Sequence, residues 1–397
     1  MTTTFMIARF LFWTSLLAVT YTYFIYPALL FLLYVVAQVC RDVRFLVGRS
    51  DRRVTALTLP NVPGISFIIA AYNEEEHLAL KLANLGQILY PSDKTQIIFV
   101  SDGSTDRTNS LLQTVSDPRV EVILLPEHQG KASALNCAVR RARHEILVFS
   151  DASTLLAEDA PQKLVRHFCS PSVGGVCGAI RFHATAESQQ TEGVYWRYEN
   201  MLRLMEARLG STLTASGALY ALRRNAYVPL TPETVLDDFV TIMNARKMGF
   251  SIVYDPEAVG FDFAANSVSG EFTRRVRLAR GSFISLKFFL KVHLPWFTRF
   301  AFVSHKLLRW LVPVMLLIAL GSNFLLISSG NPWYAGIAAL QLGLYAWAAA
   351  GFLFRENLRG IPFAQLGYFL LAMNAALLVG LFRALSRRQQ TAWQRVS

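Results

Sequence analysis

The sequence predicts an α/β fold: a mixed, mostly parallel sheet flanked by helices, joined to α-helical transmembrane segments. Three observations predict it. Short, uninterrupted apolar runs such as Ile65–Ala70 alternate with helical patterns, which is typical of strands buried on both faces of a parallel sheet. Acidic motifs follow two of these runs directly. Only 17% of the residues are charged, against about a quarter in soluble domains, which indicates that part of the chain lies in lipid.

The segment from about 61 to 180 repeats strand and helix signals in order. Strands are expected at 65–70, 97–100, 120–124 and 146–149, and helices after 73–76, after 104–105, over 130–143 and from 159 onward. Repeated units of this length imply a parallel sheet with right-handed crossovers. Further along, 214–221 has a strand-like pattern, and 235–248 and 271–289 have helical ones. Neither GxGxxG nor GxxxxGK[ST] occurs, so the dinucleotide and P-loop fingerprints are absent.

Apolar stretches at both ends predict membrane helices. Residues 10–40 carry no charge and exceed the about 20 apolar residues that one crossing needs. Three further crossings are expected at about 311–327, 333–354 and 361–382. The stretch 283–300 is apolar but includes four basic side chains, which favours one amphipathic helix lying in the interface over a crossing.

The net charge of +12 gathers beside these stretches, at 41–53 and 383–395. Basic flanks of this kind mark the cytoplasmic side of a membrane and attract anionic lipid. No basic module interleaved with aromatic residues accompanies the charge, so no nucleic acid partner is expected. The four cysteines have no paired or metal-like spacing and are expected to be reduced.

Six segments follow from these patterns. We expect an N-terminal transmembrane helix over 1–40, a basic linker over 41–60, a cytosolic domain over 61–270, amphipathic interfacial helices over 271–300, about three transmembrane helices over 301–384, and a basic tail over 385–397. Three C-terminal crossings put the arginine-rich tail outside, whereas the positive-inside rule puts it inside, so the side of the tail stays open.

Two carboxylates follow expected strands. Asp102, in the motif 101–106, comes directly after the run 97–100, and Asp151 comes directly after 146–149. Ligands of open α/β sheets bind beyond the carboxyl ends of the strands, so both side chains are expected in one cleft. Mg²⁺ and Mn²⁺ prefer carboxylate oxygens together with substrate phosphate oxygens. Asp151 fits that role, with a simple turn residue as the alternative. For Asp102 and Asp106 the alternative is an Asp-Gly turn with a helix-capping acid.

Three more positions carry chemistry. Lys131 stands at an expected helix start, where a lysine makes an anion site, with a solvated lysine as the alternative. Asp237 and Asp238 begin another helix and either complement its dipole or supply a general base. Gly217, inside the strand-like 214–221, indicates close approach of the backbone to a ligand.

Four arginines lie within the seven residues 274–280. Arg274, Arg277 and Gly281 share one helix face, and Arg275 lies on another. Arginine forks match the geometry of phosphate, so the functional interpretation is capture of a diphosphate. The alternative is the basic rim of a helix on the membrane surface.

Together, these motifs resemble those of the inverting family 2 glycosyltransferases with a GT-A fold. The membrane-embedded group with cellulose, chitin, hyaluronan and poly-N-acetylglucosamine synthases is the most similar. Segment 66–75 is similar to the opening strand and nucleotide pocket, 101–106 to the nucleobase motif, 130–136 to the GKxxALN element, 151 to the first acid of the metal-binding DxD, 237–238 to the acidic pair with the base second, and 274–281 to the QxxRW region.

The resemblance implies a hexosyl- or N-acetylhexosaminyltransferase of the inner (plasma) membrane, multi-pass, with its catalytic domain in the cytoplasm. A nucleotide diphosphosugar, UDP-linked, is the implied donor, and a glycan or lipid-linked acceptor in polysaccharide synthesis is the implied receiver. Membrane lipids and export or regulatory subunits are further expected partners. The implied site residues are Asp238 as catalytic base; Ala71, Tyr72, Asn73, Glu75, Asp102 and Lys131 for the nucleotide; Asp237, Arg275, Arg277 and Gly217 for the diphosphate or acceptor; and Asp151 for Mg²⁺ or Mn²⁺.

Three departures from the family pattern stand out. The DxD motif ends in Ser153, which leaves one carboxylate for the metal. Arg274 replaces the glutamine of QxxRW, and Leu278 replaces the tryptophan near the acceptor, which leaves processive polymerisation and single transfer both open. The departures also keep an alternative, a non-catalytic subunit that binds nucleotide or glycan within a synthesis or export complex.

Overall fold

The computed structural model describes residues 3–48, 62–183, 191–263, 268–292, 294–354 and 362–386. Most of the basic linker expected over 41–60 and nearly all of the tail expected over 385–397 lie outside the described residues.

One eight-stranded sheet forms the centre of the domain, in the order β3-β2-β1-β4-β7-β6-β8-β5. β1 pairs in parallel with β2 and β4, and β2 pairs in parallel with β3. β7 is antiparallel to both β4 and β6, which makes the sheet mixed and confirms the predicted fold class. The strands are β1 Ile65–Ala71, β2 Thr95–Asp102, β3 Val120–Leu125, β4 Ile146–Phe149, β5 Leu155–Leu156, β6 Val173–His183, β7 Tyr220–Arg223 and β8 Ser251–Phe263.

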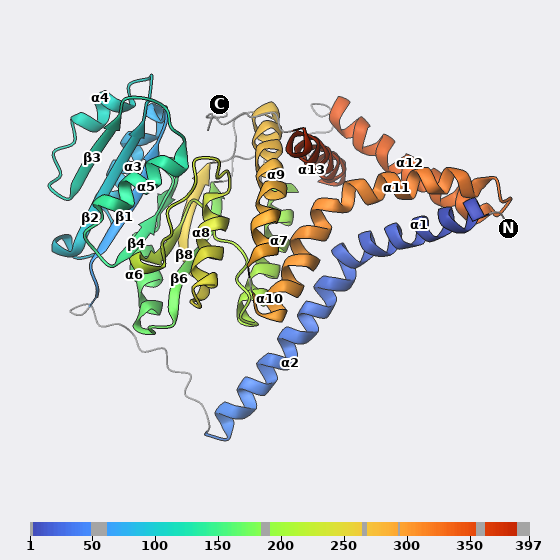
Figure 1. Cartoon of the computed structure of the whole chain (residues 1–397), viewed down its shortest axis with the longest axis horizontal. Helices are drawn as coiled ribbons and strands as arrows, with labels where there is room; N and C mark the ends of the chain where they lie inside the picture. The colour runs from blue at the N-terminus through green and yellow to red at the C-terminus, as the bar shows by residue number, and fades with distance from the viewer. Residues whose placement is uncertain are drawn as a thin grey trace.

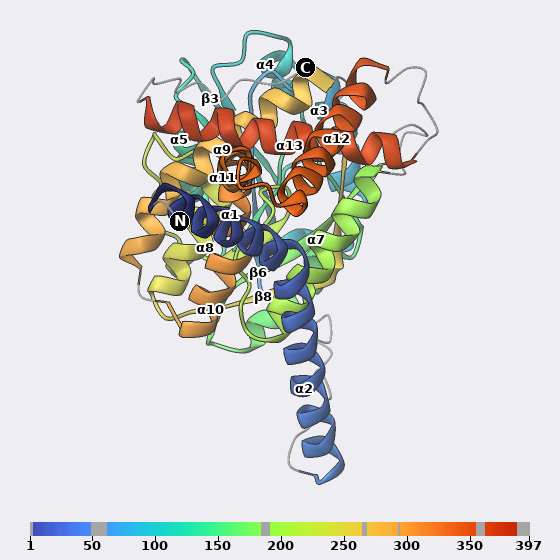
Figure 2. The ribbon, with the colours of Figure 1, turned by 90° about the vertical axis from the view of Figure 1, so that its right-hand side faces the viewer.

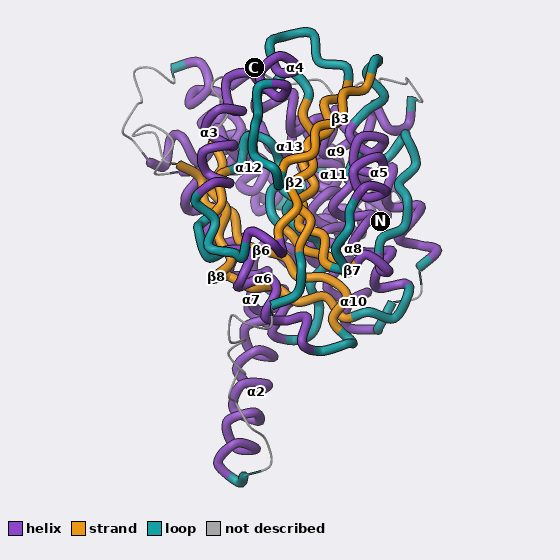
Figure 3. Tube along the Cα trace, turned by 90° about the vertical axis from the view of Figure 1, so that its left-hand side faces the viewer, coloured by secondary structure: helices purple, strands orange, loops and turns teal. Residues whose placement is uncertain are grey.

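Helices cover both faces of this sheet, as Figures 1 and 3 show. Successive side chains of a strand point to opposite faces, so both sets must be apolar when both faces are covered. Phe67 and Ile69 of β1 pack with the helices of one face, and Ile68 packs with those of the other. The first face carries α3 Glu75–Gly86, α4 Thr108–Gln113 and α6 Ala160–Val165; the second carries α5 Lys131–Arg141 and α8 Asp237–Lys247.

The N-terminal helix is much longer than one crossing. α1 Thr3–Thr20, a π-helical segment Tyr21–Ile25 and α2 Tyr26–Leu46 run on without a break over 44 residues. At 1.5 Å per residue this is about 66 Å, against about 30 Å of bilayer hydrocarbon. The helix bends at the π-helical segment, directly before Pro27, and its α2 end extends away from the body of the protein (Figure 1).

A second long apolar helix, Trp296–Ile327, joins α10 Trp296–Ala301, a π-helical segment Phe302–Leu307 and α11 Leu308–Ile327. Within the described ranges, this helix and Thr3–Leu46 are the two that are long and apolar enough to span a membrane. α12 Pro332–Leu353 and α13 Pro362–Leu385 stand close to the expected crossings 333–354 and 361–382. They do not meet the same criterion, so the number of crossings stays a prediction.

Two expected elements differ in the structure. The single amphipathic helix predicted over 283–300 is wrong, because α9 Val268–Lys291 ends first and α10 begins after Pro295. Proline disfavours helical geometry at the residue before it, which explains the break. The strand predicted over 214–221 is reduced to its end, since β7 begins at Tyr220 and the residues before it form one isolated bridge, Ser216 to Leu219.

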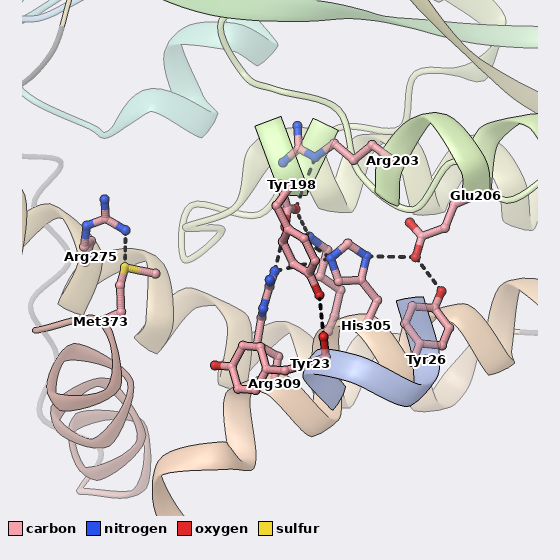
Figure 4. A network of polar contacts seen from close by, with 11 residues as sticks. Tyr23, Tyr26, Tyr198, Arg203, Glu206, Arg275, His305, Arg309 and Met373 are labelled. Atoms are coloured by element: carbon pink, nitrogen blue, oxygen red, sulfur yellow. Dashed lines mark hydrogen bonds and ion pairs between the residues drawn. The ribbon is translucent and has the colours of Figure 1, made fainter. Parts of the chain in front are cut away.

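α7 Thr191–Arg208 and α9 stand between the sheet and the apolar helices, as Figure 1 shows. Figure 2 views the molecule from the end at which α1, α11 and α12 lie. A buried polar network joins α7 to those helices (Figure 4). His305 lies between two glutamates of α7, with Nδ1 2.8 Å from Glu206 Oε1 and Nε2 3.2 Å from Glu199 Oε2. The hydroxyl of Tyr26 donates to Glu206 Oε1 over 2.7 Å. Buried charges are costly unless paired, so these contacts fix where α7 docks.

Arg203, Lys306 and Arg309 complete the network at Glu199. Lys306 Nζ donates to Glu199 Oε1 over 2.8 Å, and Arg309 Nη1 donates to Oε2 over 2.6 Å. Both π-helical segments adjoin this place, and they touch through Tyr21 Oη and Ser304 Oγ, 2.9 Å apart. α7 is therefore held by the two long apolar helices rather than by the sheet alone.

Candidate active site

Acidic and basic side chains from three loops meet at the carboxyl edge of the sheet. Lys131 is the first residue of α5, and its Nζ lies 2.8 Å from Asp151 Oδ1 in the loop after β4. The same Nζ lies 3.3 Å from Oδ2 of Asp237, the first residue of α8. Three residues that the sequence predicted in separate motifs are thus brought together around one ammonium group.

Gly217 and Asp238 border this cluster. A Cβ added at Gly217 would lie 3.5 Å from Lys131 Nζ and 3.9 Å from Asp238 Oδ2, which is ordinary contact. The loop before β7 therefore borders the cluster, and the approach of a ligand to the backbone of Gly217 stays a prediction. Asp238 is half-buried, and its Oδ1 accepts from the N–H of Phe239 over 2.7 Å.

The surroundings of Asp238 and Asp151 shift the pKa values of these two acids in opposite directions. Burial raises the pKa of Asp238 to about 6, the charge of Asp237 adds to that rise, and Lys131 opposes it. Burial also raises the pKa of Asp151, but the charge of Lys131 and its hydrogen bond outweigh that effect, so this pKa lies below its usual range. For Lys131, the two carboxylates overcome burial and hold the pKa above its usual value. Asp238 is the acid of the cluster that is poised to take a proton near neutral pH.

α9 presents its arginines in two directions. Burial lowers the pKa of Arg277, and the charges of Asp151 and Asp237 act against that, which places this guanidinium on the side of the cluster. Arg275 lies on another face, as the spacing predicted, with its guanidinium 4.8 Å above the ring of Phe369 and in contact with the Met373 sulfur of α13 (Figure 4). Contact of Arg275 with a diphosphate or acceptor stays a prediction, and the side chain itself packs between α9 and α13.

Gly281 allows α9 to approach the segment that leads into α8. A Cβ at this position would lie 2.8 Å from Val235 Cγ1 and 3.0 Å from Leu236 Cγ. Since α8 begins directly after these residues, the contact sets where Asp237 and Asp238 stand relative to α9.

Asp102, at the end of β2, has no exposed surface. One carboxylate oxygen accepts from the N–H of Gln129 and the other from the N–H of Gly130, each over 2.8 Å. Contact of Asp102 with a nucleoside stays a prediction, and both of its carboxylate oxygens are held by the loop. Asp102 instead fixes the 128–130 loop that leads into Lys131.

The loop after β1 is joined to the loop after β2. Asn73 has a φ of 55°, its N–H donates to Ser104 Oγ over 3.1 Å, and its Oδ1 accepts from the N–H of Thr105 over 2.8 Å. Glu75 Oε2 accepts from the N–H of Arg107 over 3.0 Å. Ala71 is fully buried, so its backbone is the part of it that can face a ligand. These predicted nucleotide residues thus build the wall of the site through contacts between loops.

Two residues that the motifs did not single out belong to this edge. His128 stacks on Tyr72 with ring centroids 4.0 Å apart, and its Nδ1 lies 2.9 Å from Asp102 Oδ2. The sequence signal that could have identified His128 is its position two residues before Gly130. Lys81 of α3 is completely buried, and its Nζ donates to Ser150 Oγ over 2.7 Å and to the carbonyl of Thr154 over 2.5 Å.

Burial lowers the pKa of Lys81 to about 7, with the charge of Asp151 acting in the opposite direction. Its two hydrogen bonds join the two ends of the loop 150–154 that carries Asp151, so Lys81 holds that loop against α3. Nothing in the helical pattern of 75–86 separates this lysine from one that faces solvent.

The donor set of this edge can be compared with what a divalent cation requires. Within the described residues, no group of three or more His, Cys, Asp or Glu side chains forms a metal site by itself. Mg²⁺ and related cations are commonly held by one or two carboxylates together with substrate phosphates and water. Asp151, whose side chain is 36% exposed, fits as a single protein ligand of that kind.

Comparison with known proteins supports the same interpretation. Residues 66–228 match the family described as glycosyl transferase family 2. Among curated relatives, poly-beta-1,6-N-acetyl-D-glucosamine synthase of Staphylococcus aureus strain COL is 25% identical over 267 residues, which cover 64% of this chain and 63% of the relative. The enzyme of the same name from Staphylococcus epidermidis is 26% identical over 245 residues, 60% of this chain and 57% of the relative. The chain thus matches about three fifths of the length of these relatives.

A solved structure extends the likeness to almost the whole fold. The mannosyltransferase PcManGT from Pyrobaculum calidifontis, solved in complex with GDP-Man and Mn²⁺, superposes with a TM-score of 0.71 at 23% sequence identity. The alignment covers 97% of this chain and 100% of that one. Residues 66–228 thus match the glycosyl transferase family 2 description, in agreement with the resemblance that the motifs indicated, and the chain shares its fold with that mannosyltransferase.

Proposed function

We propose that this protein is an inverting glycosyltransferase that moves a sugar from a nucleotide diphosphosugar, UDP-linked, to a hydroxyl of a glycan or lipid-linked acceptor. Its place is the synthesis of an extracellular or cell-surface polysaccharide. One observation carries the proposal: an acid with a pKa raised to about 6, Asp238, stands beside a partly buried lysine and two further carboxylates at the carboxyl edge of the sheet.

Asp238 is the proposed general base. Its carboxylate takes the proton of the acceptor hydroxyl while that oxygen attacks the anomeric carbon of the donor. The bond from this carbon to the diphosphate breaks on the opposite side, so the configuration inverts. General-base help of this kind is typically worth about 10²–10⁴ in rate. The carboxylate of Asp237 lies 3.3 Å from the ammonium of Lys131, which gives the two neighbouring acids different surroundings.

The diphosphate is proposed to lie against Lys131, Arg277 and the N-terminus of α5. Charged donors held in place before the reaction stabilise the developing charge on a leaving group. Bound Mg²⁺ or Mn²⁺, held by Asp151, would supply Lewis-acid stabilisation to the same group. The nucleoside is proposed to lie along the loop 71–75 next to Tyr72, whose ring stacks on His128, while Asp102 holds His128 and the 128–130 loop.

The acceptor is proposed to enter past Gly217, on the α8 side of the cluster. We further propose an inner-membrane protein of several crossings whose domain over 61–270 faces the cytoplasm. Two apolar helices of spanning length and the basic flank after the first of them support this orientation. Membrane lipids, and export or regulatory subunits, belong to the same proposal.

The test uses the purified full chain and a panel of UDP-sugars and GDP-sugars, with nucleoside diphosphate release as the readout. Release with one UDP-sugar above the rate without protein is the expected result. Release that depends on a GDP-sugar alone would replace the donor class and leave the mechanism in place. No release with any sugar, together with measurable UDP binding, would favour the alternative of a non-catalytic binding subunit.

A further inference from the structure

Lys131 occupies the position from which a cation would reach Asp151. Its ammonium is 2.8 Å from Asp151 Oδ1 and 3.3 Å from Asp237 Oδ2, and its side chain is 19% exposed. An ammonium at this distance and a divalent cation at about 2.0–2.1 Å from the same oxygen compete for one place. The chain therefore supplies its own counter-ion to the acid that stands where the family has its metal ligand.

Ser153, where the family motif has a second acid, strengthens the competition between the ammonium of Lys131 and a divalent cation for Asp151. A second carboxylate in the loop would leave one acid for the lysine and one for a metal, but the loop after β4 offers Asp151 alone. Lys81 lies beneath the same loop, where it donates hydrogen bonds to Ser150 and Thr154. Repulsion from the ammonium of Lys131 opposes the entry of a bare divalent cation.

A bound diphosphate changes the balance. Phosphate oxygens at the N-terminus of α5 give the ammonium of Lys131 new acceptors on the same helix, where backbone N–H groups also point. When Lys131 turns to them, one carboxylate of the cluster is released. A divalent cation and the two negative charges of a nucleotide-sugar diphosphate add no net charge together, whereas either one alone does.

From these contacts we propose that Lys131 gates the cation site. In the free protein its ammonium neutralises Asp151. When a nucleoside diphosphate binds, the ammonium moves to the phosphate oxygens and Asp151 becomes available to a divalent cation. The proposal rests on the proposed function, because the diphosphate is the ligand that turns the lysine. Binding is then ordered, with the nucleotide and cation arriving together and little binding of the cation by itself.

The first experiment measures Mn²⁺ binding to the full chain in detergent by electron paramagnetic resonance, with and without UDP. UDP binding is measured on the same preparation by calorimetry. The expected result is weak Mn²⁺ binding without UDP and binding at least about tenfold tighter with it, the factor that one charge-assisted contact is worth. Equal Mn²⁺ affinity in both conditions overturns the gate while UDP binding leaves the proposed function standing.

The second experiment separates the gate from a simple ligand role by the sign of its effect. Lys131→Met is expected to bind Mn²⁺ without UDP at least about tenfold more tightly than the natural chain, and to bind UDP more weakly. Lys131→Arg, which keeps the charge, is expected to bind Mn²⁺ without UDP as weakly as the natural chain. Lys163→Met is the matched control, because Lys163 makes its ion pair with Asp159 on α6 and away from the cluster.

The outcomes are distinct. Unchanged or weaker Mn²⁺ binding in Lys131→Met overturns the gate. A natural chain that binds no UDP in any condition removes the proposed function and the gate with it. If Lys131→Met fails to fold, the comparison of the natural chain with and without UDP still decides the question.

Discussion

The raised pKa of Asp238 makes a prediction about how activity depends on pH. The base must be ionised to accept a proton, and burial together with the charge of Asp237 moves its pKa from 3.8 to about 6. Turnover should therefore fall as the pH drops through 6. Replacing the like-charged neighbour, in Asp237→Asn, removes one cause of the rise and should move the acidic limb to lower pH.

The size of the effect follows from the pKa. A group with a pKa of about 6 is about 90% ionised at pH 7 and about 10% ionised at pH 5, which is a loss of about tenfold in turnover. Asp238→Asn removes the base altogether and should lose at least about a hundredfold. UDP affinity should stay near that of the natural chain, because Asp238 is placed on the acceptor side.

The assay is the initial rate of UDP release from pH 5 to 8 at saturating donor, with UDP binding measured at each pH. Thermal unfolding at pH 5 and 7 is the control for loss of folded protein. Near-normal turnover in Asp238→Asn would remove Asp238 from the role of base. If the acidic limb of the pH profile does not move in Asp237→Asn, the charge of Asp237 does not raise the pKa of Asp238. The assignment of Asp238 as base is then decided by Asp238→Asn alone.

Three further outcomes test the site and its support. Asp151→Ala should abolish the part of UDP affinity that depends on Mn²⁺; equal UDP affinity with and without EDTA in the natural chain would contradict the metal assignment. Arg277→Met should raise the donor KM at least about tenfold, whereas Arg275→Met should leave it near normal and lower the melting temperature, since that side chain packs against α13. Similar donor KM values for Arg277→Met and Arg275→Met would contradict the assignment of these two arginines to different faces of α9. Glu206→Leu strands the buried ring of His305 and should cost about 3–5 kcal/mol of stability, measured by thermal unfolding in detergent; an unchanged melting temperature would show that the network does not fix α7.

Sequence patterns predicted the strands of the α/β domain well where the signal was local. Runs such as 146–149 contain only apolar residues of high strand propensity, and the structure reproduces that strand with the same limits. The pattern failed over 214–221, where the polypeptide turns along the cluster instead of pairing until Tyr220. A glycine and small residues there are compatible with either path, and contacts with distant segments decide between them.

The polar network around His305 had no counterpart in the sequence analysis. Its members come from positions as far apart as Tyr26 and Glu206, and each lies in a segment whose own pattern is helical. A charge in an apolar helix signals a partner but does not identify it. The length of the first helix was likewise underestimated, because apolar content marks the part that crosses lipid and not where a helix ends.

By itself, the sequence determined the fold class, the membrane attachment as an expectation, and the residue types that any nucleotide-diphosphate site needs, because these follow from periodicity and local chemistry. Tertiary structure decided which of those groups meet. It pairs Lys131 with Asp151, buries Lys81 beneath the same loop, covers Asp102 and turns Arg275 toward α13. Charges act through space over a few ångströms, so their roles depend on neighbours that lie tens of residues away in the chain.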